Sequence, residues 1–356
     1  MGKAVDVNDP APTLPGDGRD LDPRLAAATG SAAGQRPARA PDHPMAGAGL
    51  PVWAAPGGTG PRDTYYDQPV VKAPPWGARV SAYVVVGGVA GTAASLAAAA
   101  ELTGGPALRP LARAAMGLAA GGGALGAGLL LSDLGWPSRF LNMYRVIRPT
   151  SVMNAGGYIL GATTGAAGVA VLLGRRDGLL GVAGRTAGVA AGVLGLPLAG
   201  YTGVLLSATA LPGWNVGART LPPLFLASGA ATTGSLLRLV PWGPAPAATV
   251  AAFAAAGQAA ELLAGQAHDR QLRGRPHVRA AYDSVRYRRL GPALTATSLV
   301  LGLGPWRRRR LVRLAAGVLG AAGSVTTKAS VFAAGMRSAQ DPRAVPEGPG
   351  LACRAS

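Results

Sequence analysis

The sequence predicts an all-α, polytopic membrane protein of about eight transmembrane helices. Of its 356 residues, 49% are hydrophobic and only 14% are charged, whereas a soluble domain carries about a quarter charged residues. The apolar residues also gather, from residue 76 onward, into runs close to the roughly 20 residues that a helix needs to span a bilayer. The expected spans are residues 79–100, 110–132, 152–174, 186–208, 220–240, 245–267, 288–305 and 312–335.

The seventh run is the weakest, because Pro292 and Pro305 bracket a short apolar stretch. Proline is tolerated in membrane helices where neighbouring groups satisfy the freed carbonyl, so we still expect a helix there. Eight spans place both termini on one side of the membrane. A long tail without an export signal is more easily kept inside the cell. We therefore expect a multi-pass protein of the cell membrane with both termini cytoplasmic.

The membrane domain is expected at residues 76–336, between disordered tails at 1–75 and 337–356. Residues 1–75 are rich in Pro, Gly, Ala and Asp and show no sustained periodicity. They hold seven Lys/Arg against eight Asp/Glu, so the net charge of +18 arises in the loops between apolar runs. Arginine collects in such loops because anionic headgroups attract it. This distribution indicates membrane lipids as partners and argues against nucleic acid.

Metal and redox centres are not expected in this chain. The single cysteine, Cys353, cannot hold an iron–sulfur cluster. The three histidines are His43, His268 and His277, and no pair of them faces the interior of two helices, so a haem with two histidine ligands is not expected. No catalytic residue is assigned, and the chain alone should show no turnover.

The most polar and aromatic connection in the membrane half lies between the second and third expected spans. It contains Asp133, Arg139 and Tyr144 and leads to Asn154. One interpretation is an interfacial belt, with aromatic rings at headgroup depth and arginines on phosphates. The other is a partner-docking loop or a lid over a ligand pocket, shaped by a charge-assisted hydrogen bond between Asp133 and Arg139.

Several polar residues fall inside the expected spans. Tyr201, Glu261 and Lys328 should all lie roughly 10 Å below the face that carries the tails, and Tyr83 lies about one turn into the first span. An ionisable group inside a membrane is a functional hypothesis, and Glu261, Lys328 and Gln258 could relay protons. The alternatives are an ion pair that joins two helices, a lysine that reaches the interface, and packed tyrosines.

Two basic segments flank the later spans. Residues 268–289 carry seven arginines among spaced apolar residues. This pattern favours a short interfacial helix on anionic lipid, with an acidic partner as the alternative. The WRRRR run at 306–310 is expected to anchor the opposite face at the headgroups.

Four stretches resemble the NrfD/PsrC family of membrane subunits. The segment DLGWPSRF followed by SVM, within residues 133–153, resembles its acidic-Leu-Gly-x-Pro-x-Arg-Phe loop and Ser-x-Met motif. Three further stretches are similar to the first, fourth and fifth spans of that family, in the same order along the chain. They are SAYVVVGGVAGTAAS, YTGVLLSATALPGWN and TLPPLFLASGAATTGSLL. The resemblance covers about residues 76–335.

That resemblance implies two four-helix bundles and a site for menaquinone or a similar quinone near one membrane face. It also implies an iron–sulfur partner subunit, docked in turn to a molybdopterin catalytic subunit, with which quinol electrons are exchanged. Some members place a His and an Asn beside the quinone early in the first helix. Here Trp76, Arg79 and Tyr83 stand in that region, and with Tyr201 they are the expected quinone-binding residues.

Two other functions remain open from the residues. A secondary, proton-coupled transporter would use Glu261 and Lys328 as its coupling pair between the two bundles. Its expected signature, inverted repeats with broken helices in matched positions, is not found in the sequence. A purely structural anchor would hold a catalytic subunit without binding quinone.

Overall fold

The computed structural model describes residues 20–22, 27–29, 71–133, 144–145, 147–148 and 150–347. The chain divides into two units, Met1–Tyr65 and Tyr66–Ser356, which are described separately. In the first, β1 (Asp20–Asp22) pairs with β2 (Ala27–Thr29) as a short antiparallel ribbon. The remainder of the predicted N-terminal tail, up to residue 70, lies outside the described residues.

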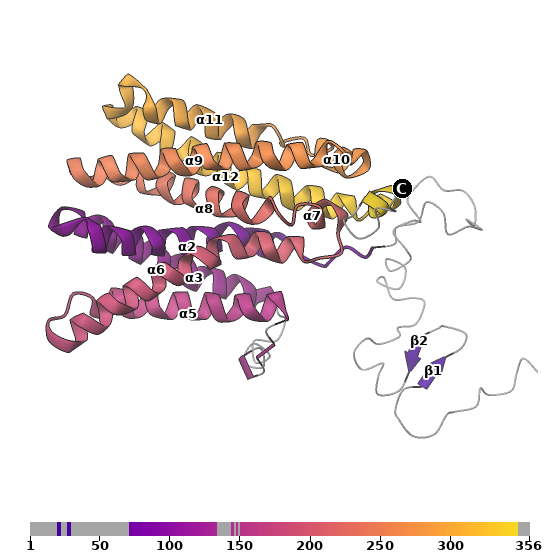
Figure 1. Ribbon diagram of the computed structural model, residues 1–356, viewed down its shortest axis with the longest axis horizontal. Helices are drawn as coiled ribbons and strands as arrows, with labels where there is room; N and C mark the ends of the chain where they lie inside the picture. The colour runs from indigo at the N-terminus through magenta and orange to yellow at the C-terminus, as the bar shows by residue number, and fades with distance from the viewer. Residues whose placement is uncertain are drawn as a thin grey trace, which may run out of the picture. The chain divides into compact units, whose positions relative to one another are not determined.

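The second unit is helical, as predicted. Within its described residues, each of the eight expected segments corresponds to one long helix (Figure 1). These are α2 (Ala78–Thr103), α3 (Gly105–Asp133), α5 (Val152–Leu173), α6 (Gly178–Ser207), α8 (Leu221–Leu237), α9 (Pro244–Leu272), α11 (Leu290–Leu303) and α12 (Arg310–Ser338).

Five of these helices are long and apolar enough to cross a membrane by length and composition: α2, α3, α5, α6 and α9. α8 has 17 residues and α11 has 14, less than the roughly 20 that an untilted span requires. The prediction of a polytopic all-α membrane protein is therefore confirmed, with five helices rather than eight that meet the requirements for a span.

The helices form two antiparallel four-helix bundles, as the family resemblance implied. α2, α3, α5 and α6 pack together as the first bundle, and α8, α9, α11 and α12 as the second. Contacts of α2 and α6 with α8, and of α2 with α12, join the two (Figure 1). α2 begins on the same face of the bundles on which α12 ends, at the right of Figure 1. We call this the tail-side face and the opposite one the far-side face.

Glycines allow the helices to approach one another closely and to turn sharply. α2 and α6 cross at Gly91 and Gly195, where a Cβ on either residue would meet the carbonyl oxygen of the other. Such small residues permit the backbone contact that holds membrane helices together. Two further glycines, Gly105 (φ 56°) and Gly178 (φ 67°), begin α3 and α6 in the left-handed conformation that glycine adopts without strain.

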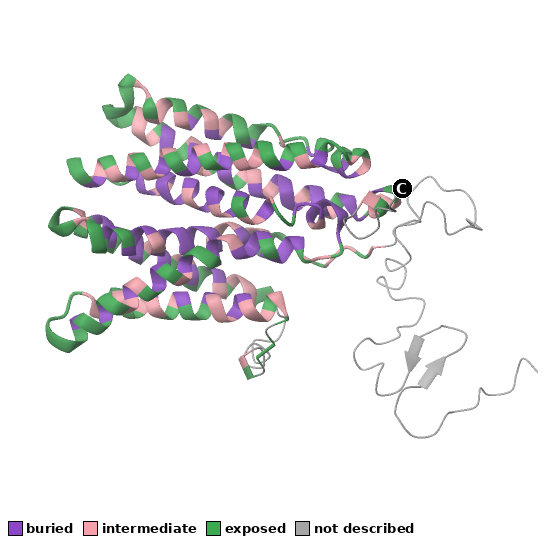
Figure 2. Cartoon of the chain, in the orientation of Figure 1, coloured by how far each residue is buried: buried purple, intermediate pink, exposed green. Residues whose placement is uncertain are grey.

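Exposed residues run along the outer sides of the helices, and buried residues lie between the helices (Figure 2). Many large apolar side chains are among the exposed residues, and several polar side chains are among the buried ones. Leu172 and Leu179 are 73% and 88% exposed, while Gln258, Glu261 and Lys328 are at most 2% exposed. In water this arrangement would leave a large apolar surface unprotected. It is the arrangement expected of a bundle surrounded by lipid.

Short helices cover the tail-side face: α7 (Pro212–Asn215), α10 (Pro276–Asp283) and the 3₁₀ helix η4 (Pro342–Glu347). η3 (Pro305–Arg308) lies at the far side. The carboxylate of Glu347 accepts hydrogen bonds from the backbone N–H groups of His277 at 3.1 Å and Val278 at 2.9 Å, at the start of α10, where an anion is favourable. Helical structure therefore continues to Glu347, within the stretch predicted as a disordered tail.

Candidate functional site

Lys328 crosses from the second bundle to the first. It lies on α12, is 1% exposed, and its Nζ donates a hydrogen bond to the carbonyl oxygen of Val84 on α2 at 3.2 Å. The ammonium also lies 5.6 Å from the ring centroid of Phe225 on α8. Gly88 on α2 leaves room for it, because a Cβ there would contact Nζ. The side chain is therefore held at the junction of the bundles and does not extend to the membrane interface.

Glu261 on α9 is the second buried charge, at 2% exposed. Its Oε2 accepts hydrogen bonds from Ser324 at 2.6 Å and from Thr295 at 3.4 Å. Its Oε1 has no hydrogen-bond partner among the described residues. Glu261 and Lys328 are close enough to interact electrostatically, but no salt bridge within 4.0 Å joins them in the described helices. The direct ion pair that was one of the alternatives is therefore not formed, and each charge has separate contacts.

Gln258 lies one turn before Glu261 on the same side of α9. Its amide Nε2 donates to the hydroxyls of Ser298 at 2.7 Å and Ser235 at 3.2 Å, while its Oε1 has no partner in the described part of the chain. Of the expected relay residues, Gln258 and Glu261 thus lie in a buried polar layer inside the second bundle, and Lys328 lies at the junction with the first bundle.

The two tyrosines are buried inside the first bundle. Tyr83 on α2 is 2% exposed and Tyr201 on α6 is 8% exposed. Tyr83 packs over Gly126 of α3, and Tyr201 packs directly over Gly156 of α5. Neither hydroxyl has a hydrogen-bond partner among the described residues. Val84, whose carbonyl accepts the hydrogen bond from Lys328, directly follows Tyr83 on α2, but the tyrosine rings point into the first bundle, against α3 and α5.

The structure describes three of the four residues expected in the docking loop. The Tyr144 hydroxyl donates to the carbonyl of Gly157 at 3.1 Å, and the Asn154 side chain accepts from the backbone N–H of Arg148 at 2.8 Å. Both residues therefore hold the end of the loop against α5. Asp133 is the exposed last residue of α3. Arg139 lies outside the described residues, and so does its predicted contact with Asp133.

Trp76 and Arg79, expected at the quinone, make contacts at the tail-side end. Trp76 stacks on Trp214 of α7 with ring centroids 5.6 Å apart. The guanidinium of Arg79 donates to the carbonyl of Ser132 at 2.6 Å, at the C-terminal end of α3, where a cation is favourable. These two residues are engaged in packing and capping, one or more turns closer to the surface than Tyr83.

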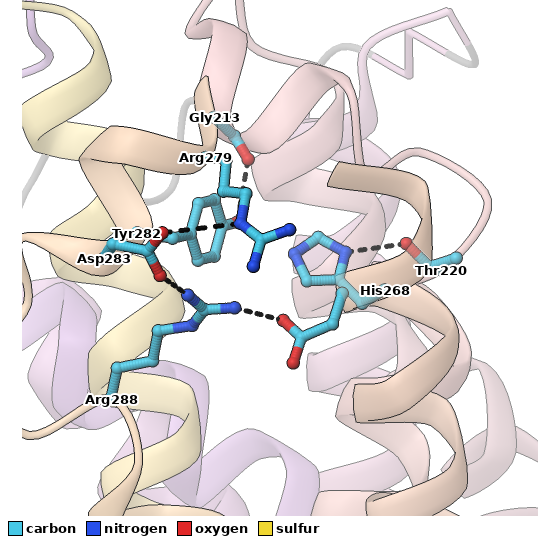
Figure 3. Close-up of polar contacts among 8 residues, drawn as sticks. Gly213, Thr220, His268, Arg279, Tyr282, Asp283 and Arg288 are labelled. Atoms are coloured by element: carbon cyan, nitrogen blue, oxygen red, sulfur yellow. Dashed lines mark hydrogen bonds and ion pairs between the residues drawn. The ribbon is translucent and has the colours of Figure 1, made fainter. Parts of the chain in front are cut away.

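His268, the first residue of the basic segment 268–289, forms a further polar cluster (Figure 3). His268 on α9 is 3% exposed, and its Nδ1 lies 2.8 Å from the hydroxyl oxygen of Thr220. Because Thr220 donates to Gln271 at 2.9 Å, Nδ1 donates to Thr220. Nε2 has no partner among the described residues. The ring lies edge-on to Tyr282 at 5.2 Å.

The α10 segment closes over this histidine. Tyr282 donates its hydroxyl hydrogen to the carbonyl of Gly213 at 2.8 Å, and burial raises the pKa of this phenol. Arg288 forms ion pairs with Asp269, at 2.6 Å, and with Asp283 (Figure 3). The predicted interfacial helix exists as α10, but part of its positive charge is neutralised within the fold. No local pattern revealed the cluster, because its members come from distant parts of the sequence.

The family of the chain follows from comparison with known proteins. The family model described as polysulphide reductase, NrfD, matches residues 68–242. That segment covers the first bundle, α7 and α8, and includes Tyr83 and Tyr201, whereas Glu261 and Lys328 lie beyond it. No curated protein matches the chain. Over residues 68–242 the chain belongs to the polysulphide reductase NrfD family, whose members serve as membrane subunits of oxidoreductase complexes.

Proposed function

We propose that this chain is the quinone-interacting membrane subunit of an oxidoreductase complex. Menaquinone or a similar quinone would bind inside the first bundle, beside Tyr83 and Tyr201. The observation that carries the proposal is that both tyrosines are at least 92% buried while neither hydroxyl has a hydrogen-bond partner among the described residues. Neither hydroxyl oxygen is among the fully buried atoms that lack a partner, so both donors can be reached by a ligand that brings acceptors.

A quinone matches these groups chemically. It carries two carbonyl oxygens, which accept hydrogen bonds, on a flat apolar ring, and it supplies reversible uptake of two electrons and two protons. Tyr83 and Tyr201 can donate to carbonyl oxygens from α2 and α6, which are neighbouring helices of the first bundle. The glycines packed against their rings, Gly126 and Gly156, leave the rings in contact with backbone rather than with bulky side chains.

The buried charges are suited to handling the protons. Two protons are released for each quinol that is oxidised. Glu261 has one carboxylate oxygen without a hydrogen-bond partner in the described helices, and this oxygen could accept one proton at a time. Lys328 holds a positive charge close by and orients the Val84 carbonyl next to Tyr83. Gln258 continues the polar layer by one turn.

Electrons would pass to or from a separate protein, because no redox centre is expected in this chain. We propose an iron–sulfur subunit docked on the tail-side face, near Asp133, Arg139, Tyr144 and Asn154. A molybdopterin catalytic subunit would be bound to it in turn. The position of Tyr83, about one helical turn below that face, would keep the path between quinone and partner short.

Quantification of bound quinone tests the proposal. The chain is purified from membranes together with whatever proteins accompany it, and quinone is extracted with solvent and measured by chromatography. We expect about one quinone per chain, and about a tenfold loss in the variant Tyr83→Phe/Tyr201→Phe, since two lost hydrogen bonds of about 0.7 kcal/mol each add up to about 1.4 kcal/mol. Tyr287→Phe is the control, because Tyr287 is 39% exposed.

Three results separate the proposal from its rivals. Quinone retained by the wild type and lost from the tyrosine variant supports it. Absence of quinone from a preparation that still contains its oxidoreductase partners would instead indicate a structural anchor. Quinone that persists unchanged in the double variant would place the site elsewhere. Reduction of a partner iron–sulfur signal by added quinol, followed by electron paramagnetic resonance, would confirm electron exchange directly.

A further inference from the structure

A separate cavity of about 910 Å³ lies at the far-side end of the second bundle, between α8, α9, α11 and α12. No acidic residue is among the described residues that line it. Its positive charge comes from five arginines: Arg238, Arg307, Arg308, Arg310 and Arg313. None of the five takes part in a salt bridge within the described part of the chain. The cavity is therefore a concentrated, uncompensated positive site at the end of the bundle opposite the proposed quinone site.

Arg238 is the most informative of these arginines. It is only 4% exposed, and its Nη2 donates one hydrogen bond, to the carbonyl of Ala251 at 3.3 Å. Its Nη1 is buried and has no partner among the described residues. Gly302 on α11 makes space for the guanidinium, because a Cβ at that position would come within 2.6 Å of Nη1. Burying a guanidinium with unpaired N–H groups costs free energy unless an anion accepts hydrogen bonds from it and balances its charge.

Two helix N-termini add to the positive potential. α9 begins at Pro244 and α12 at Arg310, and neither has a side-chain cap or an acidic residue in its first turn. The N-terminal end of a helix is its positive end and favours anions. Arg310 and Arg313 nevertheless lie at the start of α12, and Arg313 donates to the carbonyl of Arg238 at 2.8 Å. Two cations at the positive end of a helix are unfavourable on their own, and a bound anion makes the arrangement favourable.

The remaining wall of the cavity is apolar. Leu239, Trp242, Leu301 and Leu314 line it, at the level where aromatic side chains mark the membrane interface. A single inorganic anion would leave most of 910 Å³ unfilled. An acyl chain, by contrast, would cover this apolar wall.

We propose that the cavity binds an anionic phospholipid. The phosphate would lie against the Arg238 and Arg313 guanidinium groups, and an acyl chain would lie along the apolar wall between α9 and α11. Arg307 and Arg308 would close over the headgroup. Basic pockets between membrane helices bind such headgroups in this way. The inference does not depend on the quinone proposal, since it rests on a different end of the bundle.

A neighbouring cavity provides an internal comparison. It has a volume of about 550 Å³ and lies at the far-side end of the first bundle. Arginines line it as well, but so do two acidic residues, Glu101 and Asp177. These carboxylates offset part of the charge, so we expect the weaker phospholipid selectivity there.

Lipid retention by the full-length protein, measured by native mass spectrometry in detergent, tests the proposal. The probes are dioleoylphosphatidylglycerol, dioleoylphosphatidylcholine with the same chains, and inorganic phosphate. We expect the anionic lipid to bind about tenfold more tightly than the zwitterionic one, a difference of about 1.4 kcal/mol, because the arginines repel the quaternary ammonium group of phosphatidylcholine. Arg238→Gln should abolish this preference. Arg307→Gln/Arg308→Gln should weaken the preference for the anionic lipid. This exposed pair can still be tested if Arg238→Gln does not fold.

The control is Arg286→Gln/Arg289→Gln, which removes two charges from exposed positions on the tail-side face and should leave the preference intact. Equal retention of both lipids by the wild type would overturn the proposal. The proposal would also be overturned if the control variant lowered the preference for the anionic lipid as strongly as Arg307→Gln/Arg308→Gln does. The preference would then reflect the overall charge of the protein. Binding of inorganic phosphate alone at the same affinity would assign the cavity to a free anion and not to lipid.

Discussion

Replacement of Lys328 by methionine removes the charge that joins the two bundles while keeping a side chain of similar length. Lys328 makes one charge-assisted hydrogen bond, worth about 1.5–3 kcal/mol, and one cation–π contact, worth about 0.5–2 kcal/mol. Its attraction to Glu261 must stay below about 4 kcal/mol, the value for two charges 4 Å apart at an effective dielectric constant near 20. Loss of one partner also leaves Glu261 without an opposite charge. We expect Lys328→Met to lower the free energy of unfolding by about 3–5 kcal/mol.

A double-mutant cycle tests the reason for that loss. Glu261→Gln should also destabilise the protein, but Lys328→Met/Glu261→Gln should lose less than the sum of the single losses by about 0.5–3 kcal/mol, because no uncompensated charge remains. Denaturant unfolding of the purified chain in detergent measures all four states. Thr326→Val is the control on α12, since that exposed hydroxyl bonds only its own helix, at Ala322. Losses that add to within about 0.5 kcal/mol would refute an electrostatic coupling.

Two further outcomes are expected. Gly156→Ala should displace the Tyr201 ring, which occupies the space of the new Cβ. Bound quinone should fall, and so should the free energy of unfolding, by about 1–3 kcal/mol. Gly165 on the same helix has open space around it, so Gly165→Ala should change neither quantity when quinone extraction and thermal unfolding are measured. Tyr282→Phe should cost about 0.5–1.5 kcal/mol through the lost bond to Gly213. Burial raises the pKa of Tyr282 above its usual 10.0, so wild-type stability should fall as the pH rises past that value. The variant should lack this alkaline loss.

The helices themselves could be predicted from the sequence, because apolar runs of spanning length have few alternatives in a bilayer. Their ends could not. α6 begins at Gly178, well before the expected start at residue 186, and carries Arg185 within its first turns. α9 continues to Leu272, through the charged residues Asp269 and Arg270. Both helices extend beyond the apolar stretch that hydropathy detects, into the interfacial layer where arginine is tolerated.

The candidate site could be predicted in part. Burial of Tyr83, Tyr201, Glu261 and Lys328 was expected from their positions along the spans, and the structure places all four inside the protein. The contact of Lys328 with α2 could not be foreseen, because it depends on how the second bundle packs against Gly88.

The His268 cluster and the far-side arginine cavity could not be predicted from the sequence either. His268 meets Thr220 and Tyr282 only because α8, α9 and α10 come together at the tail-side face. Arg238 and Arg313 are 75 residues apart along the chain, and no local pattern links them.

Cross-linking with a photoreactive quinone tests the central claim most directly. The purified complex is irradiated with the probe, and labelled peptides are identified by mass spectrometry, with unlabelled menaquinone as competitor. We expect competable labelling on the segments of α2 and α6 that contain Tyr83 and Tyr201. Labelling confined to the far-side ends of the helices, around Arg238, or labelling that excess menaquinone does not reduce, would contradict a quinone site beside Tyr83 and Tyr201.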